Sequence, residues 1–495
     1  MSSLIRASFW LSLSELAFNL SGYIIHALMG RILDTADYGR FSIIITFTTM
    51  VIILIGRGLP ISMSKYLSEI TQDKANGYFR VKKAALYLQL TVVSCVTLIY
   101  FLISPIFAKL LNDPSLTNLF RISSLIIPAF AMASFYAYYF TGIQEFGKKS
   151  FLKFLRSIAK IFFIVGLGYF FKVTGAIIGQ ALAPLVVYIT GYFIDPFSKL
   201  KCKKEPSFKN TPLDKNLMKK LAQFAWPIIL FMLFYELMIS LNLYFVKAML
   251  REDALAGIYN AAMTVSRIPY YLFFFMTVIL LPKISESTSA GTKEKTQKLL
   301  QKAFKYLFLG IFPTVTILSL FSGSAVRFFY GAGYSAAGPV MSILIIGFGF
   351  LTIFYVLTFV LNGSGFNKFP MYISLLGVIL NAFLNYFLIK EMGLLGSALA
   401  TTITSGIILL AAIIYSNRKI IKFINVFSIT KYLAASLIIY WAGTFLTQGR
   451  YIFILWSILL MALYITLMII MKEIGKKDYD YIIKSLKKQK KPSNL

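Results

Sequence analysis

The stretch Gly179-Gln180-Ala181-Leu182-Ala183 returns 217 residues later as Gly396-Ser397-Ala398-Leu399-Ala400. Four further pairs lie at nearly the same spacing: Leu125–Ile127 with Leu344–Ile346, Phe135-Tyr136 with Phe354-Tyr355, Phe146–Lys148 with Phe366–Lys368, and Glu15 with Glu236. The spacing drifts by only four residues over these five matches. Two homologous hydrophobic halves in one chain are typical of membrane transporters in which one half rocks against the other.

Composition places the chain in a membrane. Of its 495 residues, 58% are hydrophobic and only 14% are charged, whereas a soluble protein carries about 25% charged residues. Apolar runs of roughly 20 residues, long enough to cross the hydrocarbon core, recur from end to end. Such runs must be helices, because the core has no water to satisfy backbone groups. The first run is full length and lacks a small-residue cleavage site, so we expect a transmembrane helix and no cleavable signal peptide.

The hydropathy pattern predicts an all-α membrane protein with about fourteen transmembrane helices. Six of them in each half give two parallel, pseudo-symmetric lobes, since an even number of spans keeps both halves in the same orientation. The last two spans have no counterpart in the repeat. The predicted spans lie near residues 8–29, 41–64, 84–107, 119–141, 151–171, 174–196, 222–246, 256–281, 303–323, 340–361, 370–389, 393–415, 432–447 and 451–471.

The predicted domain organisation follows from these spans. It comprises an N-lobe (1–198), a basic cytoplasmic linker (199–220), a C-lobe (221–416), the two extra helices (417–471) and a basic cytoplasmic tail (472–495). We expect a multi-pass protein of the cytoplasmic (inner) membrane with both termini in the cytoplasm.

Positive charge follows membrane topology. The net charge is +31, and the basic residues gather in alternate connections, which is the positive-inside pattern. The linker, the connection from Lys283 to Lys305 and the tail are the heaviest clusters, and we expect them to attract anionic lipids. This pattern explains the charge without nucleic acid, so no nucleic-acid partner is expected.

Catalytic and cofactor motifs are missing from the sequence. Cys95 falls within a span and Cys202 in the linker, and the chain has one histidine, His26. No group of His, Cys, Asp or Glu has metal-ligand spacing, and no glycine-rich phosphate loop is found. We therefore expect no cofactor, no metal and no enzymatic activity, and a transport cycle driven by an ion gradient, the membrane potential or the substrate gradient.

Five charged residues fall at membrane depth, where a charge is costly unless it faces a wet cavity or a partner. Arg57 is flanked by two glycines and a proline, and Arg267 precedes Ile268-Pro269, which predicts a kink. Together with Lys160 they could line a cavity that binds an anion such as a diphosphate.

Glu15 and Glu236 occupy matching places in the first helix of each lobe. They are candidates for proton or sodium coupling, or they could form structural ion pairs with Arg57 and Arg267. His26 and Lys247 also match across the repeat, near outer helix ends, where an interfacial position is expected.

Four segments resemble the multidrug, oligosaccharidyl-lipid and polysaccharide exporter superfamily. Arg31–Phe41 is similar to the pattern that follows the first helix of polysaccharide (O-antigen-type) flippases, and Ser64–Glu69 resembles the end of their second helix. Leu280–Ser285 resembles the end of helix eight that polysaccharide and lipid II flippases share, and Phe329–Tyr334 their glycine-aromatic loop before helix ten. The similarity extends to about residue 420.

The resemblance implies a flippase that moves polyprenyl-diphosphate-linked oligosaccharide by alternating access. In the lipid II branch, cavity arginines come from helices one, two and eight. Arg267 matches the helix-eight pattern, and Arg57 lies in the region of helix two. Helix one has no arginine at cavity depth, because Arg6 precedes the first span and Arg31 follows it. This difference from the lipid II branch favours the polysaccharide branch. The family also implies function as a monomer, with a glycan polymerase or glycosyltransferases as possible partners.

Three other functions are compatible with parts of the pattern. A lipid II flippase or a cation-coupled multidrug antiporter would have the same fold, and the antiporter would depend on Glu236 rather than on Arg267. A membrane glycan polymerase fits less well, because such enzymes usually carry a sizeable outer loop and no outer connection here exceeds roughly 17 residues.

Overall fold

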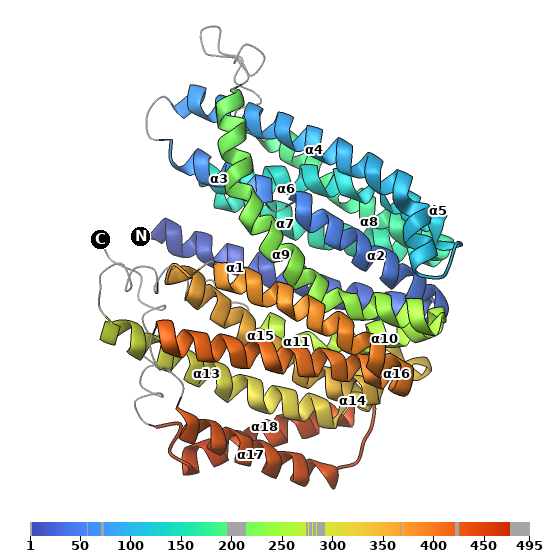
Figure 1. The fold of residues 1–495 in the computed structure, drawn as a ribbon, viewed down its shortest axis with the longest axis vertical. Coiled ribbons are helices and arrows are strands. Elements are labelled where there is room, and N and C mark those ends of the chain that lie inside the picture. The colour runs from blue at the N-terminus through green and yellow to red at the C-terminus, as the bar shows by residue number, and fades with distance from the viewer. Residues whose placement is uncertain are drawn as a thin grey trace. The chain divides into compact units, whose positions relative to one another are not determined.

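The computed structural model describes residues 2–56, 58–70, 74–195, 214–273, 293–366, 368–420 and 425–475, with the single positions 276, 280 and 284. Every regular element in these ranges is helical, which confirms the all-α prediction (Figure 1). The elements are α1 (Ser2–Ile32), α2 (Thr35–Gly56), α3 (Gly58–Ser68), α4 (Lys74–Leu110), α5 (Leu116–Ser123), α6 (Ile126–Gly142), α7 (Phe146–Lys160), η1 (Ile161–Val165), α8 (Gly166–Ile194), α9 (Lys215–Leu250), α10 (Asp253–Ser266), α11 (Ile268–Phe273), α13 (Lys293–Leu320), α14 (Ser322–Tyr330), η2 (Ala332–Tyr334), α15 (Ala337–Gly363), α16 (Lys368–Lys419), α17 (Val426–Thr444) and α18 (Ile452–Ile470).

The helices form two compact units, residues 3–260 and 261–495. The boundary lies beyond the predicted linker because α9 packs along α2, α3 and α4 in the first unit. The predicted lobes describe the sequence repeat rather than this packing, and their boundaries stay predictions. Most of the linker and the tail lie outside the described residues.

Ten helical segments of the described chain are long and apolar enough to span a membrane. Two of them, 146–194 and 368–419, each contain two predicted spans separated by a kink. α1 and the α10–α11 run contain the two remaining predicted spans. The structure is therefore compatible with fourteen crossings.

The two kinked segments explain the sequence repeat. Each reverses direction at a residue with positive φ, Lys172 (52°) in α8 and Gly393 (56°) in α16. A Cβ on Gly179 would lie 2.3 Å from the carbonyl oxygen of Phe163, and one on Gly396 would lie 1.9 Å from that of Leu388. The repeated glycines are therefore required where the two arms of each hairpin touch.

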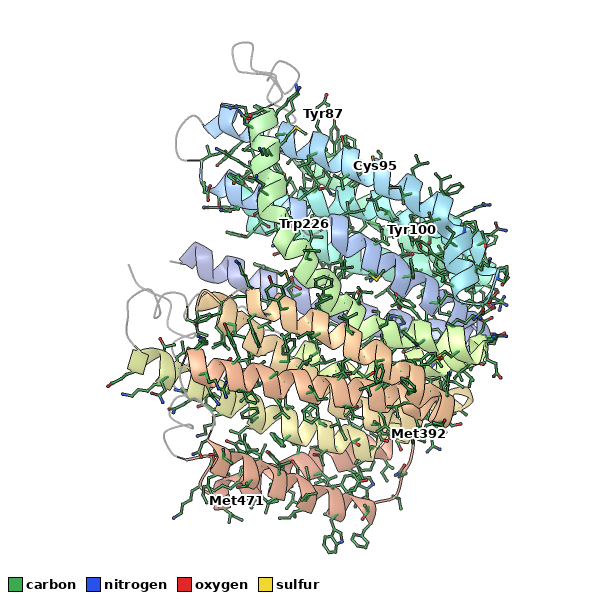
Figure 2. The ribbon with its side chains drawn as sticks, in the orientation of Figure 1. Tyr87, Cys95, Tyr100, Trp226, Met392 and Met471 are labelled. Atoms are coloured by element: carbon green, nitrogen blue, oxygen red, sulfur yellow. The ribbon has the colours of Figure 1, made fainter. Side chains whose placement is uncertain are left out.

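Many large apolar side chains are exposed on the helices, as expected of a protein whose solvent is lipid. On α4, Tyr87 and Cys95 lie on the outer face, whereas Tyr100 points inward (Figure 2). The hydroxyl of Tyr100 is hydrogen-bonded to Thr48 (3.1 Å) and Ser123 (3.0 Å), which joins α4 to α2 and α5.

In the second unit, α15 packs against α16 and α13, and most of its side chains are buried. Inside the α16 hairpin, the amide of Asn385 donates to the carbonyl oxygen of Asn381 (2.8 Å), and Ser397 Oγ donates to Asn385 Oδ1 (2.7 Å). These polar groups join the two arms of the hairpin. α17 and α18 lie side by side, and Glu473 after α18 accepts from Lys431 of α17 (2.9 Å).

A buried ion pair lies in the core of the first unit. Lys82 on α4 bonds to Asp195 at the end of α8, and the Asp195 side chain is completely buried. The Lys82 ammonium also lies 4.5 Å from the centre of the Tyr139 ring. Removing one partner of such a pair leaves the other charge buried without compensation.

We expect Lys82→Met to lower the free energy of unfolding by about 3–5 kcal/mol. The midpoint of thermal unfolding of the purified protein measures this loss. Lys109→Met is the matched control, because Lys109 belongs to the same helix but is exposed. Equal midpoints for the two variants would contradict the importance of the pair.

Candidate functional site

α7 has two opposite faces of contrasting chemistry. Phe151, Phe154, Ile158 and Phe162 recur every three to four residues and are about half exposed or more, so they form the face toward lipid. Four basic residues recur with the same period on the opposite face: Lys149, Lys153, Arg156 and Lys160. We call these four residues the cationic stripe. Because it lies opposite the lipid-facing side chains, the cationic stripe faces the protein interior.

All four side chains of the cationic stripe are half-buried, and they lie against α1 and α6. The Phe18 ring of α1 is surrounded by three of them: its centre is 5.2 Å from Lys153 Nζ, 5.3 Å from Arg156 Cζ and 5.0 Å from Lys160 Nζ. Arg156 Cζ is also 4.2 Å from the centre of the Phe130 ring. Attraction of cations to aromatic rings partly offsets the cost of holding these charges away from water.

Glu15 of α1 forms an ion pair with Lys153. The cationic stripe gathers four basic side chains on one face of α7, and such a cluster favours binding of an anionic ligand.

A π-helical segment, η1, directly follows Lys160. π-Helical turns inside α-helices often occur at functional sites, because the extra residue per turn changes the direction of side chains. Here the turn separates the cationic stripe from the rest of the helix, which carries no further charge before Lys172.

Two predicted site residues lie near each other: Lys160 belongs to the cationic stripe, and Glu15 pairs with its member Lys153. Arg57 lies outside the described residues. The residue before it, Gly56, packs against the stripe's neighbour Phe130, since a Cβ on Gly56 would be 2.6 Å from that ring.

Arg267 lies in the second unit, at the break between α10 and α11 that the following Ile-Pro pair predicts. Its guanidinium contacts Met263 Sδ (3.7 Å) and lies 5.8 Å from the centre of the Phe348 ring. Its Nε is buried without a hydrogen-bond partner, and no described carboxylate of this unit pairs with it. Arg267 therefore has donors available for a ligand.

Glu236 lies on α9 in the first unit, where Ser240 Oγ donates to its Oε1 (3.0 Å). The expected alternative, an ion pair between Glu15 and Arg57, falls on a residue outside the described part of the chain and stays a prediction. The described partner of Glu15 is Lys153. The sequence gives no means of deciding which helix packs against α1, so it could not identify this partner.

Sequence reasoning missed Lys149, Lys153 and Arg156, although their spacing provides a signal. They lie at the predicted start of the fifth span, where basic residues are expected for topological reasons alone. Only their position opposite the lipid-facing aromatic residues distinguishes them from ordinary cytoplasmic charges.

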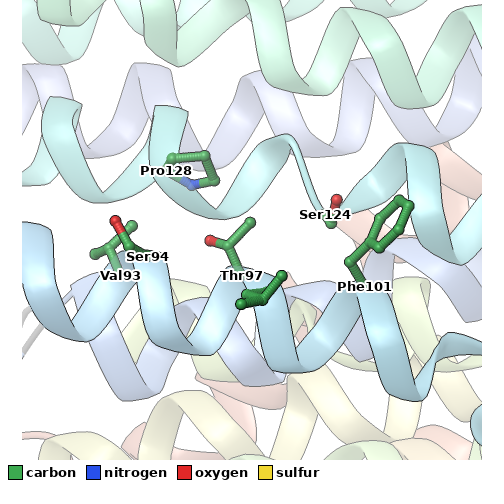
Figure 3. A pocket seen from close by; sticks show the side chains of 7 residues that line it. Val93, Ser94, Thr97, Phe101, Ser124 and Pro128 are labelled. Carbon is green, nitrogen blue, oxygen red and sulfur yellow. The ribbon is translucent and has the colours of Figure 1, made fainter.

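A cavity of about 350 Å³ lies between α4 and the α5–α6 region, but its lining is unsuited to an anionic ligand (Figure 3). It has hydroxyl groups at Ser94, Thr97 and Ser124, and it lacks charge. Across the described residues, no group of three or more His, Cys, Asp or Glu side chains could hold a metal ion. This cavity is therefore a poorer candidate for an anion-binding site than the cationic stripe.

Related proteins have the same fold. The inward closed conformation of the lipid II flippase MurJ aligns with a TM-score of 0.74 at 15% identity, over 94% of this chain and 98% of that structure. An inward-facing multidrug resistance transporter of the MATE family aligns with a TM-score of 0.71 at 14% identity, over 84% of this chain and 98% of that one. These likenesses confirm the predicted two-lobed helical fold.

Curated relatives extend over most of the chain. The lipid II flippase MurJ of Bacillus subtilis is 24% identical over 81% of this chain and 80% of its own length. An uncharacterized membrane protein of Methanocaldococcus jannaschii is 22% identical over 81% of this chain and 95% of its own length.

Two family models match the chain. The model described as polysaccharide biosynthesis protein covers residues 4–288, more than half of the sequence, and the MatE model covers residues 227–387. The matches confirm the resemblance that the sequence motifs indicated. The chain belongs to the polysaccharide biosynthesis protein family, within the multidrug, oligosaccharidyl-lipid and polysaccharide exporter superfamily.

Proposed function

We propose that this chain is a flippase that carries polyprenyl-diphosphate-linked oligosaccharide from the inner to the outer leaflet of the cytoplasmic membrane. The coarser class, a multi-pass membrane transporter of the exporter superfamily, follows from the family and the fold. The cationic stripe is the single observation that carries the finer proposal, because it offers an anion-binding surface inside a membrane helix.

A diphosphate suits the cationic stripe chemically. Its oxygens carry at least two negative charges and accept several charge-assisted hydrogen bonds, which are stronger than neutral ones. Arg156 can bind two oxygens with its planar guanidinium, and the lysines act as point charges. Four cations on one face of a membrane helix are costly in hydrocarbon unless protein partners, an anion or water compensate them.

The length of the cationic stripe suits a path into the membrane. At 1.5 Å per residue, Lys149 and Lys160 are separated by about 16 Å along the helix axis, roughly half of the ~30 Å hydrocarbon core. With the N-terminus in the cytoplasm, the stripe begins at the cytoplasmic boundary and ends near the membrane centre. A diphosphate could therefore pass from Lys149 toward Lys160 while the prenyl tail stays in lipid and the glycan occupies water.

Arg267 and Arg57 are two further proposed substrate-binding residues. In the second unit, the buried Nε of Arg267 has no hydrogen-bond partner among the described residues, which supports a ligand-binding role. Arg57 is assigned a substrate-binding role by its place in helix two and its two flanking glycines.

Glu15 and Glu236 are the proposed ion-coupling residues. Glu15 pairs with Lys153 of the cationic stripe. In the proposed cycle, the Glu15 carboxylate and the substrate diphosphate compete for the Lys153 ammonium group. Glu236, bonded only to the Ser240 hydroxyl in the described part of its unit, is the candidate for a second ionisable position.

Depletion of the chain from its native cell tests this function. We expect lipid-linked oligosaccharide to accumulate in the inner leaflet and to become inaccessible to a glycan-cleaving enzyme added outside. Normal outer-leaflet glycan combined with greater sensitivity to cationic drugs would contradict the proposal and favour the multidrug antiporter. A loss confined to the peptidoglycan precursor would favour a lipid II flippase instead.

A further inference from the structure

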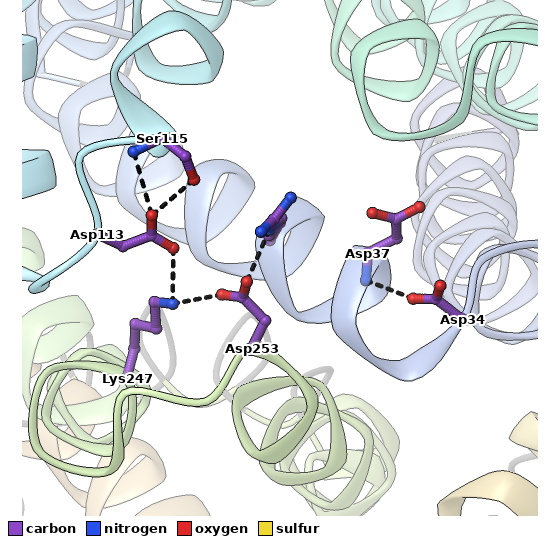
Figure 4. A network of polar contacts seen from close by, with 7 residues as sticks. Asp34, Asp37, Asp113, Ser115, Lys247 and Asp253 are labelled. Atoms are coloured by element: carbon purple, nitrogen blue, oxygen red, sulfur yellow. Dashed lines mark hydrogen bonds and ion pairs between the residues drawn. The ribbon is translucent and has the colours of Figure 1, made fainter.

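Lys247, at the end of α9, is almost completely buried, with 2% of its side chain exposed. Its ammonium lies between two carboxylates, 2.8 Å from Asp113 Oδ2 and 2.5 Å from Asp253 Oδ1 (Figure 4). Two acidic residues thus enclose Lys247, Asp113 from the connection before α5 and Asp253 from the start of α10. The interfacial position expected for Lys247 stays a prediction.

Further contacts extend this cluster on both sides. Arg40 Nε donates to the second oxygen of Asp253 (2.7 Å), and the amide of Asn112 donates to the carbonyl oxygen of Ala248 (2.8 Å). Burial raises the pKa of Asp113, but hydrogen bonds from Lys247 and Ser115 outweigh burial and hold the pKa below its usual value. Asp113 is thus held in its charged form by the lysine.

A neutral layer adjoins the charged one: Asn260 lies seven residues after Asp253 on α10, and Tyr38 and Ser42 lie on either side of Arg40 on α2. The amide of Asn260 donates to the hydroxyl oxygens of Tyr38 (3.0 Å) and Ser42 (2.8 Å). The backbones of α2 and α10 touch at the charged cluster, since a Cβ on Gly39 would lie 1.9 Å from the carbonyl oxygen of Asp253. Two layers, one charged and one neutral, therefore join the same helix ends.

The partners in these contacts come from two separate parts of the sequence. One set lies between residues 38 and 113, in the predicted N-lobe, and the other between 247 and 260, in the predicted C-lobe. By the predicted topology, the adjoining ends of α2, α4, α5, α9 and α10 are all extracytoplasmic. The contacts thus fasten the outer ends of the two lobes to each other.

We propose that Arg40, Asp113, Lys247 and Asp253 form a separable latch that closes the extracytoplasmic end of the transport path. The proposal rests on the proposed function for its place in the cycle, because a substrate that leaves outward requires these ends to part. The four residues are called the outer latch below.

The chemistry of the outer latch suits repeated opening. Buried ion pairs contribute little net stability, because the desolvation cost offsets the attraction between the charges. When the latch opens, water hydrates the same four charged groups, so the closed and open states differ little in free energy. An apolar contact of the same area would lose its stabilisation on opening and would resist separation.

Thiol labelling tests the outer latch without any substrate. In a Cys95→Ser, Cys202→Ser background, Ser42→Cys places a reporter beneath the latch, where Ser42 is 1% exposed. We expect a membrane-impermeant maleimide added outside to label it slowly, and Lys247→Met to raise the rate roughly tenfold, which corresponds to ~1.4 kcal/mol. Lys247→Arg should keep the slow rate.

Thr48→Cys is the control reporter, because Thr48 is buried on the same helix against Tyr100. Its labelling by the maleimide should remain slow in every variant.

Cross-linking supplies a second test if Lys247→Met fails to fold. Bridging Asn112→Cys to Ala248→Cys with a short bis-thiol reagent should abolish glycan export, and reduction should restore it. The control pair Ser428→Cys and Glu473→Cys joins α17 to the segment after α18, and bridging it should leave export unchanged.

Two results would overturn the proposal. One is equal labelling of Ser42→Cys in the parent and Lys247→Met proteins, and the other is glycan export by the protein with the bridged latch. If the parent shows no glycan export, the flippase assignment fails, and the labelling rates still decide whether the latch opens.

Discussion

Replacing Arg156 and Lys160 together by glutamine is expected to slow glycan transport at least about 100-fold. Each residue supplies a charge-assisted hydrogen bond worth about 1.5–3 kcal/mol, and each 1.4 kcal/mol corresponds to a factor of ten. Folding should be unaffected or slightly improved, because the two cations lie side by side against the same aromatic ring. The rate of outer-leaflet glycan appearance in a strain that lacks the native gene measures the effect.

The control for this pair is Lys148→Gln, which removes a cation from the same helix outside the cationic stripe. Lys148 forms a partly exposed ion pair with Glu145 (3.7 Å), of the kind that contributes little energy. We expect transport near the parent rate. Arg156→Lys should fall between the two, since it keeps the charge but loses the planar donor pair. Parent-level transport by the double variant would remove the cationic stripe from the mechanism.

Arg267→Ala is the second variant with a large expected effect. A guanidinium that binds one diphosphate through two N–H groups contributes about 3 kcal/mol or more, so export should fall at least about 100-fold. Stability should remain, because Arg267 has no described carboxylate partner in its unit whose charge would be left uncompensated. Loss of function without loss of stability distinguishes a ligand-binding arginine from a structural one.

Arg327→Ala is a suitable control for Arg267. Arg327 belongs to the same unit, is exposed, and donates to the carbonyl oxygen of Gly323 (3.3 Å) within its own helix. Export by this variant should equal that of the parent at the same protein level. An Arg267→Ala protein that folds and exports normally would show that Arg267 does not bind the head group, and one that unfolds would contradict the expected stability.

Much of the fold could be predicted from local sequence signals. The spacing of apolar runs reflects the thickness of the membrane, and the recurrence of Gly179 at Gly396 reflects the same hairpin contact in both halves. The break at Arg267 was expected from Ile268-Pro269. Each of these features depends on residues that are close in sequence, so no knowledge of tertiary packing is needed.

The site was predicted less completely because its parts are far apart in sequence. Lys160 and Glu15 were identified as charged residues at membrane depth, but the pairing of Glu15 with Lys153 depends on α1 packing against α7. The burial of Lys247 likewise requires Asp113 and Asp253 to come together at one membrane face. Such contacts between distant segments leave no signal in a single sequence.

Reconstitution tests the central claim most directly. The purified chain is inserted into liposomes that contain a polyprenyl-diphosphate-linked oligosaccharide with a fluorescent glycan, and a membrane-impermeant quencher reports the fraction in the outer leaflet. We predict that the protein equilibrates the labelled lipid across the bilayer and that the Arg156→Gln, Lys160→Gln protein does not. Equal quenching in liposomes with the parent chain, with the double variant and without protein would contradict the account.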